Sequence, residues 1–173
     1  MANQEKLEVF DSFRKGMISY LSGLEDDGIK RKKSACTHRI ALALERTFPS
    51  DVMIDIDTLG ADLLVWDGKA KIHLALFWSE DYLTEKERER AYAFHLSQNP
   101  SLTLAFSVLP GKDWLLVYRF EKSFLEYLHI DKATFEETPL RQKSAGAEDE
   151  GQMFLRLPQK RRRLSASSPS QDL

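Results

Sequence analysis

The chain has 173 residues, of which 42% are hydrophobic and 30% are charged. This length fits one ordinary domain with a real core and is too short for two large ones, and the composition excludes a fully disordered chain. The single cysteine, Cys36, excludes an intramolecular disulfide and a cysteine-rich metal site. This fits a reducing compartment, and we expect Cys36 to be a small buried apolar residue.

The formal net charge is only −2, so a general attraction of the whole chain to a polyanion is excluded and any nucleic-acid contact must be local. The charge is unevenly distributed, because seven of the 25 basic and four of the 27 acidic residues follow position 137. We therefore predict a single domain over residues 1–137, with a net charge of −5, and a disordered, basic and serine-rich tail over residues 138–173, with a net charge of +3.

The N-terminus begins polar and acidic and lacks the basic start and apolar stretch of a secretory signal. No run approaches the roughly 20 apolar residues that cross a bilayer. We expect a cytoplasmic protein without a membrane contact.

Two helices are predicted at the start of the chain. Apolar residues at intervals of three and four predict a first helix that ends within residues 23–28: Leu7, Phe10, Phe13, Met17, Leu21 and Leu24. A basic run follows, formed by Lys30, Arg31, Lys32 and Lys33. Ser34 is then the expected N-cap of a second helix that runs to about Thr47 and is closed by Pro49.

The apolar period then changes to two, because Val52, Ile54 and Ile56 alternate with Met53 and two aspartates, which predicts a half-buried strand. The runs over residues 61–66 and 72–78 are almost wholly apolar. With the turn over residues 67–70 between them, they predict a central hairpin that is buried on both faces.

Thr84 and Glu87 form a capping box that opens a third helix through His95, which ends at Asn99 and Pro100. Two strands follow over residues 102–108 and 114–120, joined by a turn over residues 110–113. A short helix around Ser123 to Leu128 is expected to complete the domain.

The order helix, strand, strand, strand, helix, strand over residues 34–120 resembles the common core of the PD-(D/E)XK nuclease superfamily. We therefore expect an α/β, restriction-endonuclease-like fold, with a mixed sheet of about four to five strands and a central β-hairpin flanked by helices. Carried over position by position, the resemblance places Glu45 at the helix glutamate and Asp62 at the strand aspartate. It places Ala75 and Phe77 where the family has its Glu-x-Lys pair.

Counting outwards from the turn, we expect Asp62 to lie opposite Ala75, on a face that it shares with His73 and Phe77. Ala75 and Phe77 can neither hold a metal ion nor position water, so the resemblance implies that most of the catalytic set is missing. We expect no cofactor, because the vestigial pair Glu45 and Asp62 offers a hard cation too few oxygen ligands.

An active nuclease would need Mg²⁺ or Mn²⁺ at Asp62 and catalytic groups relocated from neighbouring elements. Lys86 on the third helix is the candidate replacement, and His73 is a candidate nitrogen ligand for a transition metal. Ordinary structural roles are the alternative for each residue. Asp62 can accept backbone hydrogen bonds at a strand entry, Glu45 can pair with an arginine, and His73 can be a half-buried histidine.

Two basic clusters are candidate nucleic-acid-binding segments: Lys30 to Lys33, and the group Lys160, Arg161, Arg162 and Arg163. The first also fits a solvated helix entry. In a eukaryotic host the second also fits a nuclear address, and Arg162-Arg163-Leu164-Ser165 fits a site for a basophilic kinase.

The favoured interpretation is a non-catalytic binding or regulatory module on a nuclease-like scaffold, which engages protein or nucleic acid. Two alternatives stay open: a divergent metal-dependent nuclease with relocated catalytic residues, and a pure protein-interaction subunit without affinity for nucleic acid.

Overall fold

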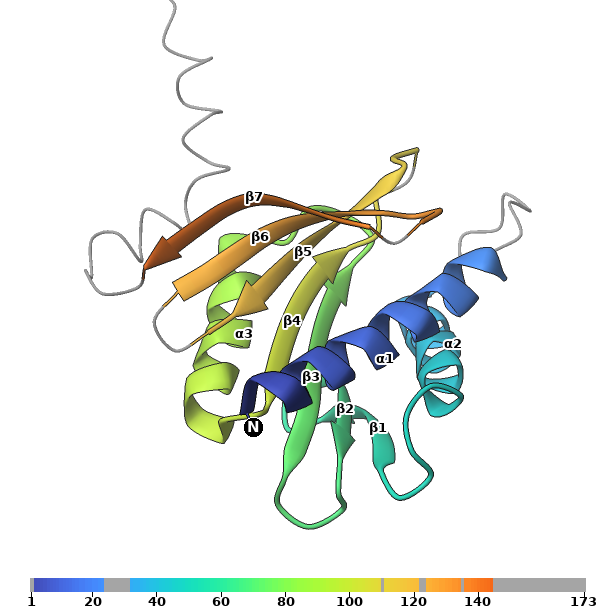
Figure 1. Cartoon of the computed structure of the whole chain (residues 1–173), viewed down its shortest axis with the longest axis vertical. Coiled ribbons are helices and arrows are strands. Elements are labelled where there is room, and N and C mark those ends of the chain that lie inside the picture. Colours follow the sequence, from blue (N-terminus) through green and yellow to red (C-terminus); the bar gives the residue numbers. More distant parts are fainter. Residues whose placement is uncertain (1, 24–31, 110, 122–123, 135, 145–173) are drawn as a thin grey trace, which may run out of the picture.

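The computed structural model describes residues 2–23, 32–109, 111–121, 124–134 and 136–144. These residues form a mixed seven-stranded sheet with helices on both faces (Figure 1). The elements are α1 (Ala2–Ser22), α2 (Lys33–Glu45), β1 (Met53–Thr58), β2 (Ala61–Trp66), β3 (Ile72–Ser79), α3 (Glu85–Gln98), β4 (Leu102–Ser107), β5 (Trp114–Phe120), β6 (Phe124–Asp131) and β7 (Glu137–Ser144). The expected α/β class with a mixed sheet is therefore confirmed.

The strands lie in the sheet in chain order, from β1 at one edge to β7 at the other. All neighbours are antiparallel except β3 and β4, which are parallel and joined by the crossover helix α3. The sheet is larger than the four to five strands expected from the sequence, because β6 and β7 extend it.

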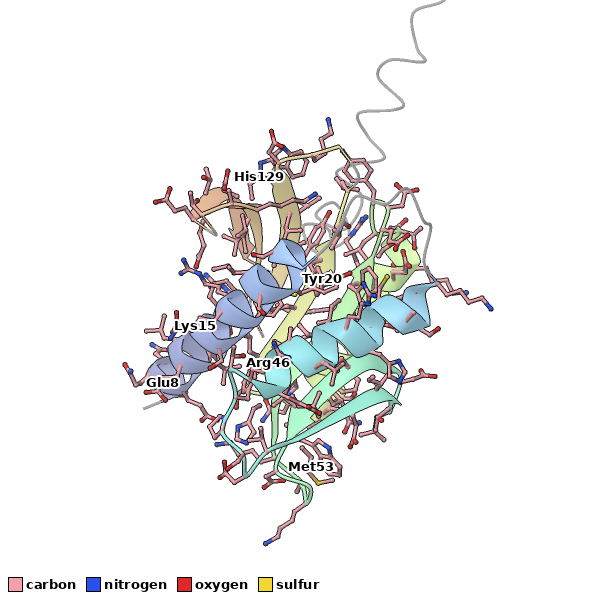
Figure 2. All side chains as sticks on the ribbon, turned by 90° about the vertical axis from the view of Figure 1, so that its right-hand side faces the viewer. Glu8, Lys15, Tyr20, Arg46, Met53 and His129 are labelled. Atoms are coloured by element: carbon pink, nitrogen blue, oxygen red, sulfur yellow. The ribbon has the colours of Figure 1, made fainter. Side chains whose placement is uncertain are left out.

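α1 and α2 lie side by side over one face of the sheet (Figure 2), and α3 covers the other. The first face buries the stripe of α1, including Phe13 and Met17, against residues such as Phe106 of β4. The second face buries Phe94 of α3 against Phe77 of β3. Cys36 is buried in the first core and carries a free thiol, as expected. None of the described helices is long and apolar enough to cross a bilayer.

The predicted start of α3 is confirmed, and that of α2 is wrong in detail. Thr84 caps α3 through a reciprocal pair of bonds with Glu87, and Asn99 ends the helix in a left-handed conformation. By contrast, Lys32 occupies the N-cap position of α2 and Lys33 is the first helical residue. No side chain caps this helix. Ser34 is exposed inside the first turn, so it cannot be the N-cap.

The hairpin of β2 and β3 is confirmed, with both strands largely buried, but its register differs from the prediction by two residues. Ala75 pairs with Leu64 rather than with Asp62. The turn is one residue longer than expected, because the Asp67 carboxylate accepts backbone bonds from residues 69, 70 and 71, and a bulge follows Val65. A shift of two keeps every side chain on its expected face.

The helix expected around Ser123 to Leu128 is wrong, because β6 runs from Phe124 to Asp131 between β5 and β7. Leu128 and Ile130 are fully buried on either side of the half-buried His129, which is the alternation of a strand. β7 then carries the sheet past the predicted domain boundary at residue 137. The rest of the predicted tail, residues 145–173, lies outside the described residues.

Candidate functional site

Asp62, the second residue of β2, lies at the centre of a charged cluster. Its carboxylate accepts a bond of 2.8 Å from the backbone N–H of Trp78 and one of 3.0 Å from Nζ of Lys33. The guanidinium of Arg90 lies 3.6 Å from the other carboxylate oxygen. We call Asp62, Lys33 and Arg90 the Asp62 cluster. Its carboxylate is 16% exposed, so two cations and a backbone donor surround a mostly buried anion.

The cluster exists because three elements meet at the start of β2. Lys33 is the first residue of α2 on one face of the sheet, and Arg90 belongs to α3 on the other face. Asp62 therefore links the two helical layers across the end of the sheet. Both cations also lie over aromatic rings, with Lys33 Nζ 5.7 Å from the centroid of Trp78 and Arg90 Cζ 5.2 Å from that of Phe77.

Ala75 and Phe77 lie on the α3 side of β3, in the buried core. Phe77 is 1% exposed, and its ring packs edge-on against Phe94 with the centroids 5.6 Å apart. The positions at which the nuclease resemblance expects a glutamate and a lysine are therefore filled by packed apolar groups, which offer no metal ligand.

Glu45 is not brought to Asp62. It is the last residue of α2, whereas Lys33, which touches Asp62, is the first. Thirteen residues of helix separate the two ends by about 18 Å. Glu45 is exposed, so the glutamate that the nuclease resemblance implied as a partner of Asp62 does not reach it.

His73 is also far from the cluster, because it lies at the opposite end of β3. Its Nδ1 is 3.2 Å from the carboxylate of Glu5 on α1, so a shared metal site with Asp62 is excluded. Glu5 also accepts bonds from Lys71 Nζ at 2.7 Å and Ser101 Oγ at 3.0 Å. The bond from Lys71, supported by those from Ser101 and His73, lowers the pKa of Glu5 to about 2, while partial burial opposes the shift.

Lys86 is exposed one helical turn before Arg90, so both point to the same side of α3. Of the first basic run, Lys32 and Lys33 are described and exposed, and Lys33 joins the cluster. Lys30 and Arg31, the cluster Lys160 to Arg163 and the kinase-type sequence lie outside the described residues.

Within the part of the chain that the structure describes, no group of three or more His, Cys, Asp and Glu side chains could hold a metal ion. The Asp62 carboxylate instead pairs with the side chains of Lys33 and Arg90. Comparison with protein-family models, with curated proteins and with solved structures gives no significant match.

The sequence did not reveal Arg90 as a partner of Asp62. The alternative expectation that Asp62 accepts a backbone hydrogen bond is confirmed, but the sequence did not identify Trp78 as the donor. A signal for Arg90 was present, because Lys86 was already a candidate and Arg90 follows it by one turn on the same helix face. No sequence pattern pointed to the Trp78 N–H, because that bond depends on how β2 and β3 align.

Proposed function

We propose that the chain is a non-catalytic binding or regulatory module on a PD-(D/E)XK nuclease-like scaffold, which engages an anionic partner, protein or nucleic acid, at the Asp62 cluster. The order α2, β1, β2, β3, α3, β4, with β3 and β4 parallel across the crossover helix, supports the scaffold. The proposed function is supported mainly by the contacts of Asp62, because its carboxylate is bound by Lys33, Arg90 and a backbone N–H.

Two cations at one carboxylate disfavour a divalent metal there, because they repel it and already satisfy the anion. They leave a net positive charge at the cluster, and Lys86 adds a further cation one turn before Arg90 on α3. Lys33 and Arg90 are 46% and 51% exposed, so N–H donors not used by Asp62 can reach a phosphate or carboxylate of a partner. Such contacts would position a partner without cutting it.

A divergent nuclease is the second candidate, and one observation favours it. Relocated chemistry requires at least two polar side chains that converge on Asp62, and Lys33 and Arg90 do so. Both are cations, however, and the described residues contain no group of three or more His, Cys, Asp and Glu side chains that could hold a metal ion. Since Mg²⁺ and Mn²⁺ need several oxygen ligands, this arrangement supports binding better than hydrolysis.

Incubation of the purified protein with varied DNA and RNA substrates, in Mg²⁺ or Mn²⁺, separates these candidates. The binding module is expected to leave all substrates intact. Robust cleavage that the Asp62→Ala variant loses would overturn the proposal and support the nuclease.

Fluorescence anisotropy with labelled DNA and RNA then tests the kind of partner. A nucleic-acid binder is expected to show affinity that falls with salt and that weakens in the variant Lys33→Gln/Arg90→Gln. The matched control is Lys69→Gln/Lys112→Gln, which also removes two exposed cations, one between β2 and β3 and one between β4 and β5. If no salt-dependent binding is seen, the nucleic-acid branch of the proposal fails.

A further inference from the structure

The contacts of the Asp62 carboxylate are divided unequally between its two oxygens. Oδ2 accepts bonds from the backbone N–H of Trp78 at 2.8 Å and from Nζ of Lys33 at 3.0 Å. Oδ1 faces Nη2 of Arg90 at 3.6 Å, a distance too long for a hydrogen bond. The bond to Trp78 therefore ties the carboxylate to the backbone of β3, whereas both cations reach it through long, rotatable side chains.

The cluster thus consists of a fixed, mostly buried anion and two movable cations that are about half exposed. Ion pairs with such exposed partners are weak, so an anion that arrives from solvent can take the place of the carboxylate at each cation. The exchange requires only that the side chains of Lys33 and Arg90 turn outward. Asp62 can stay where it is, because the Trp78 N–H continues to bind it.

The distribution of cations favours one class of incoming anion. Lys86 is exposed one turn before Arg90, about 6 Å along the axis of α3, and adds a third cation on that side of the cluster. A nucleic-acid strand carries one negative charge per nucleotide, so it can contact Lys33, Arg90 and Lys86 together. A single carboxylate or phosphate gains little, because at each cation it replaces one anion by another.

We propose that Asp62 is an internal competitor, which occupies Lys33 and Arg90 until the phosphates of a nucleic-acid strand replace it. This inference rests on the proposed function, because it concerns the same cations, and it adds that the charge of Asp62 weakens binding. Since both ion pairs must open before the phosphates make full contact, the charge lowers the affinity about fivefold, which corresponds to about 1 kcal/mol. Asp62 thereby selects against ligands that offer only one anionic group.

Fluorescence anisotropy of a labelled oligothymidylate with the full chain at low salt tests this. Asp62→Asn removes the charge and keeps an acceptor for the Trp78 N–H, and it is expected to bind about fivefold more tightly than the parent chain. Asp62→Ser, a second neutral variant with an acceptor, is expected to show the same gain. Adding Lys33→Gln and Arg90→Gln to Asp62→Asn is expected to abolish the gain, because the released cations are then absent.

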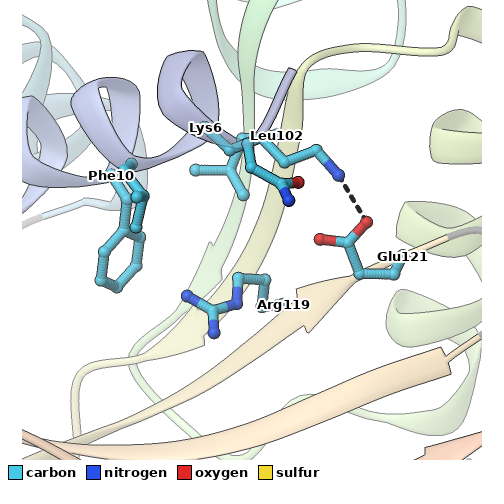
Figure 3. Close-up of a pocket in the computed structure, with 7 residues that line it drawn as sticks. Lys6, Phe10, Leu102, Arg119 and Glu121 are labelled. Atoms are coloured by element: carbon cyan, nitrogen blue, oxygen red, sulfur yellow. Dashed lines mark hydrogen bonds and ion pairs between the residues drawn. The ribbon is translucent and has the colours of Figure 1, made fainter. Parts of the chain in front are cut away.

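The matched control is Glu121→Gln, which also removes one negative charge beside a lysine. Glu121 is 19% exposed and pairs with Lys6 at 2.6 Å, at a pocket between α1 and the end of β5 (Figure 3). It follows β5, three strands or about 14 Å from β2 in the sheet, so its loss is expected to leave the affinity unchanged.

Three results would overturn the inference. They are an equal gain in Glu121→Gln, a gain that remains without Lys33 and Arg90, and neutral Asp62 variants that bind no more tightly than the parent chain, including no binding by any of them. If the parent chain binds through Lys33 and Arg90 but the neutral variants show no gain, only this inference fails and the proposed function stands.

Discussion

The indole Nε1–H of Trp78 donates a hydrogen bond to Oγ1 of Thr37, 2.9 Å away in the core between β3 and α2. The Thr37 hydroxyl donates in turn to the carbonyl of Lys33, at 2.9 Å. The backbone N–H of the same Trp78 binds Asp62. One tryptophan therefore fixes the first turn of α2, which carries Lys33, and the carboxylate to which Lys33 binds.

The variant Thr37→Val tests this link, because it keeps the shape of the side chain and removes the hydroxyl. A buried indole N–H without an acceptor costs about 1–3 kcal/mol, so the free energy of unfolding is expected to fall by that amount. Urea denaturation measures it. Thr37→Ser, which keeps the hydroxyl, is the control and is expected to lose less. Equal losses in the two variants would show that the hydrogen bond contributes nothing.

Two variants of Asp62 separate its charge from its hydrogen bond. Asp62→Asn removes the charge but keeps an acceptor for the Trp78 N–H, and because Lys33 and Arg90 are about half exposed we expect a loss of at most about 1 kcal/mol. Asp62→Ala also leaves the backbone N–H without its acceptor, which adds about 1–3 kcal/mol. Chemical denaturation of both variants measures the difference. If they are equally stable, the bond to Trp78 does not hold β2 against β3.

The Glu5 network predicts a dependence of stability on pH. The pKa of Glu5 is about 2 in the folded chain, against an ordinary value of 4.5, so the unfolded chain binds more protons between these values. The stabilisation is present above pH 4.5 and is lost as the pH falls towards 2. Glu5→Gln is therefore expected to be less stable than the parent chain at neutral pH and to approach it in acid.

Unfolding by urea at a series of pH values measures this. The control is Glu8→Gln, which changes an exposed carboxylate on the same helix that accepts a bond from Gln4. It is expected to leave the pH dependence close to that of the parent chain. If the free energy of unfolding changes with pH in the same way in Glu5→Gln and in the parent chain, Glu5 does not cause the loss of stability in acid.

Local signals in the sequence predicted the elements that local chemistry determines. The stripe of α1, the capping box at Thr84 and the hairpin of β2 and β3 each depend on residues close in sequence. The structure confirms the capping box, the hairpin and the burial of Phe10, Phe13 and Met17, but Leu7 of the predicted stripe is 62% exposed. The contact between Asp62 and Arg90 could not be predicted in this way. That contact depends on where the crossover helix α3 lies against the sheet. The expected contact between Glu45 and Asp62 was wrong for a similar reason, because α2 packs on the sheet with its first residue, rather than its last, beside Asp62.

β6 was missed for a related reason. Phe124, Leu125 and Leu128 are spaced like one side of a helix, and a short apolar run cannot be assigned from its period alone. Its pairing with β5 on one side and β7 on the other decides the outcome, because the backbone bonds of a strand are made to distant residues. The alternation becomes clear only from Leu128 onwards.

The strand assignment of β6 makes Leu128 a core residue and predicts the cost of removing it. Leu128 is fully buried on the face covered by α1 and α2, so Leu128→Ala leaves a cavity and is expected to lower the free energy of unfolding by about 2–5 kcal/mol. Leu42→Ala, at a leucine that is 58% exposed on α2, is the control and is expected to cost less than about 0.5 kcal/mol. Thermal and urea denaturation measure both. Similar small losses in the two variants would contradict the place of β6 in the sheet, because a leucine outside the core leaves no cavity.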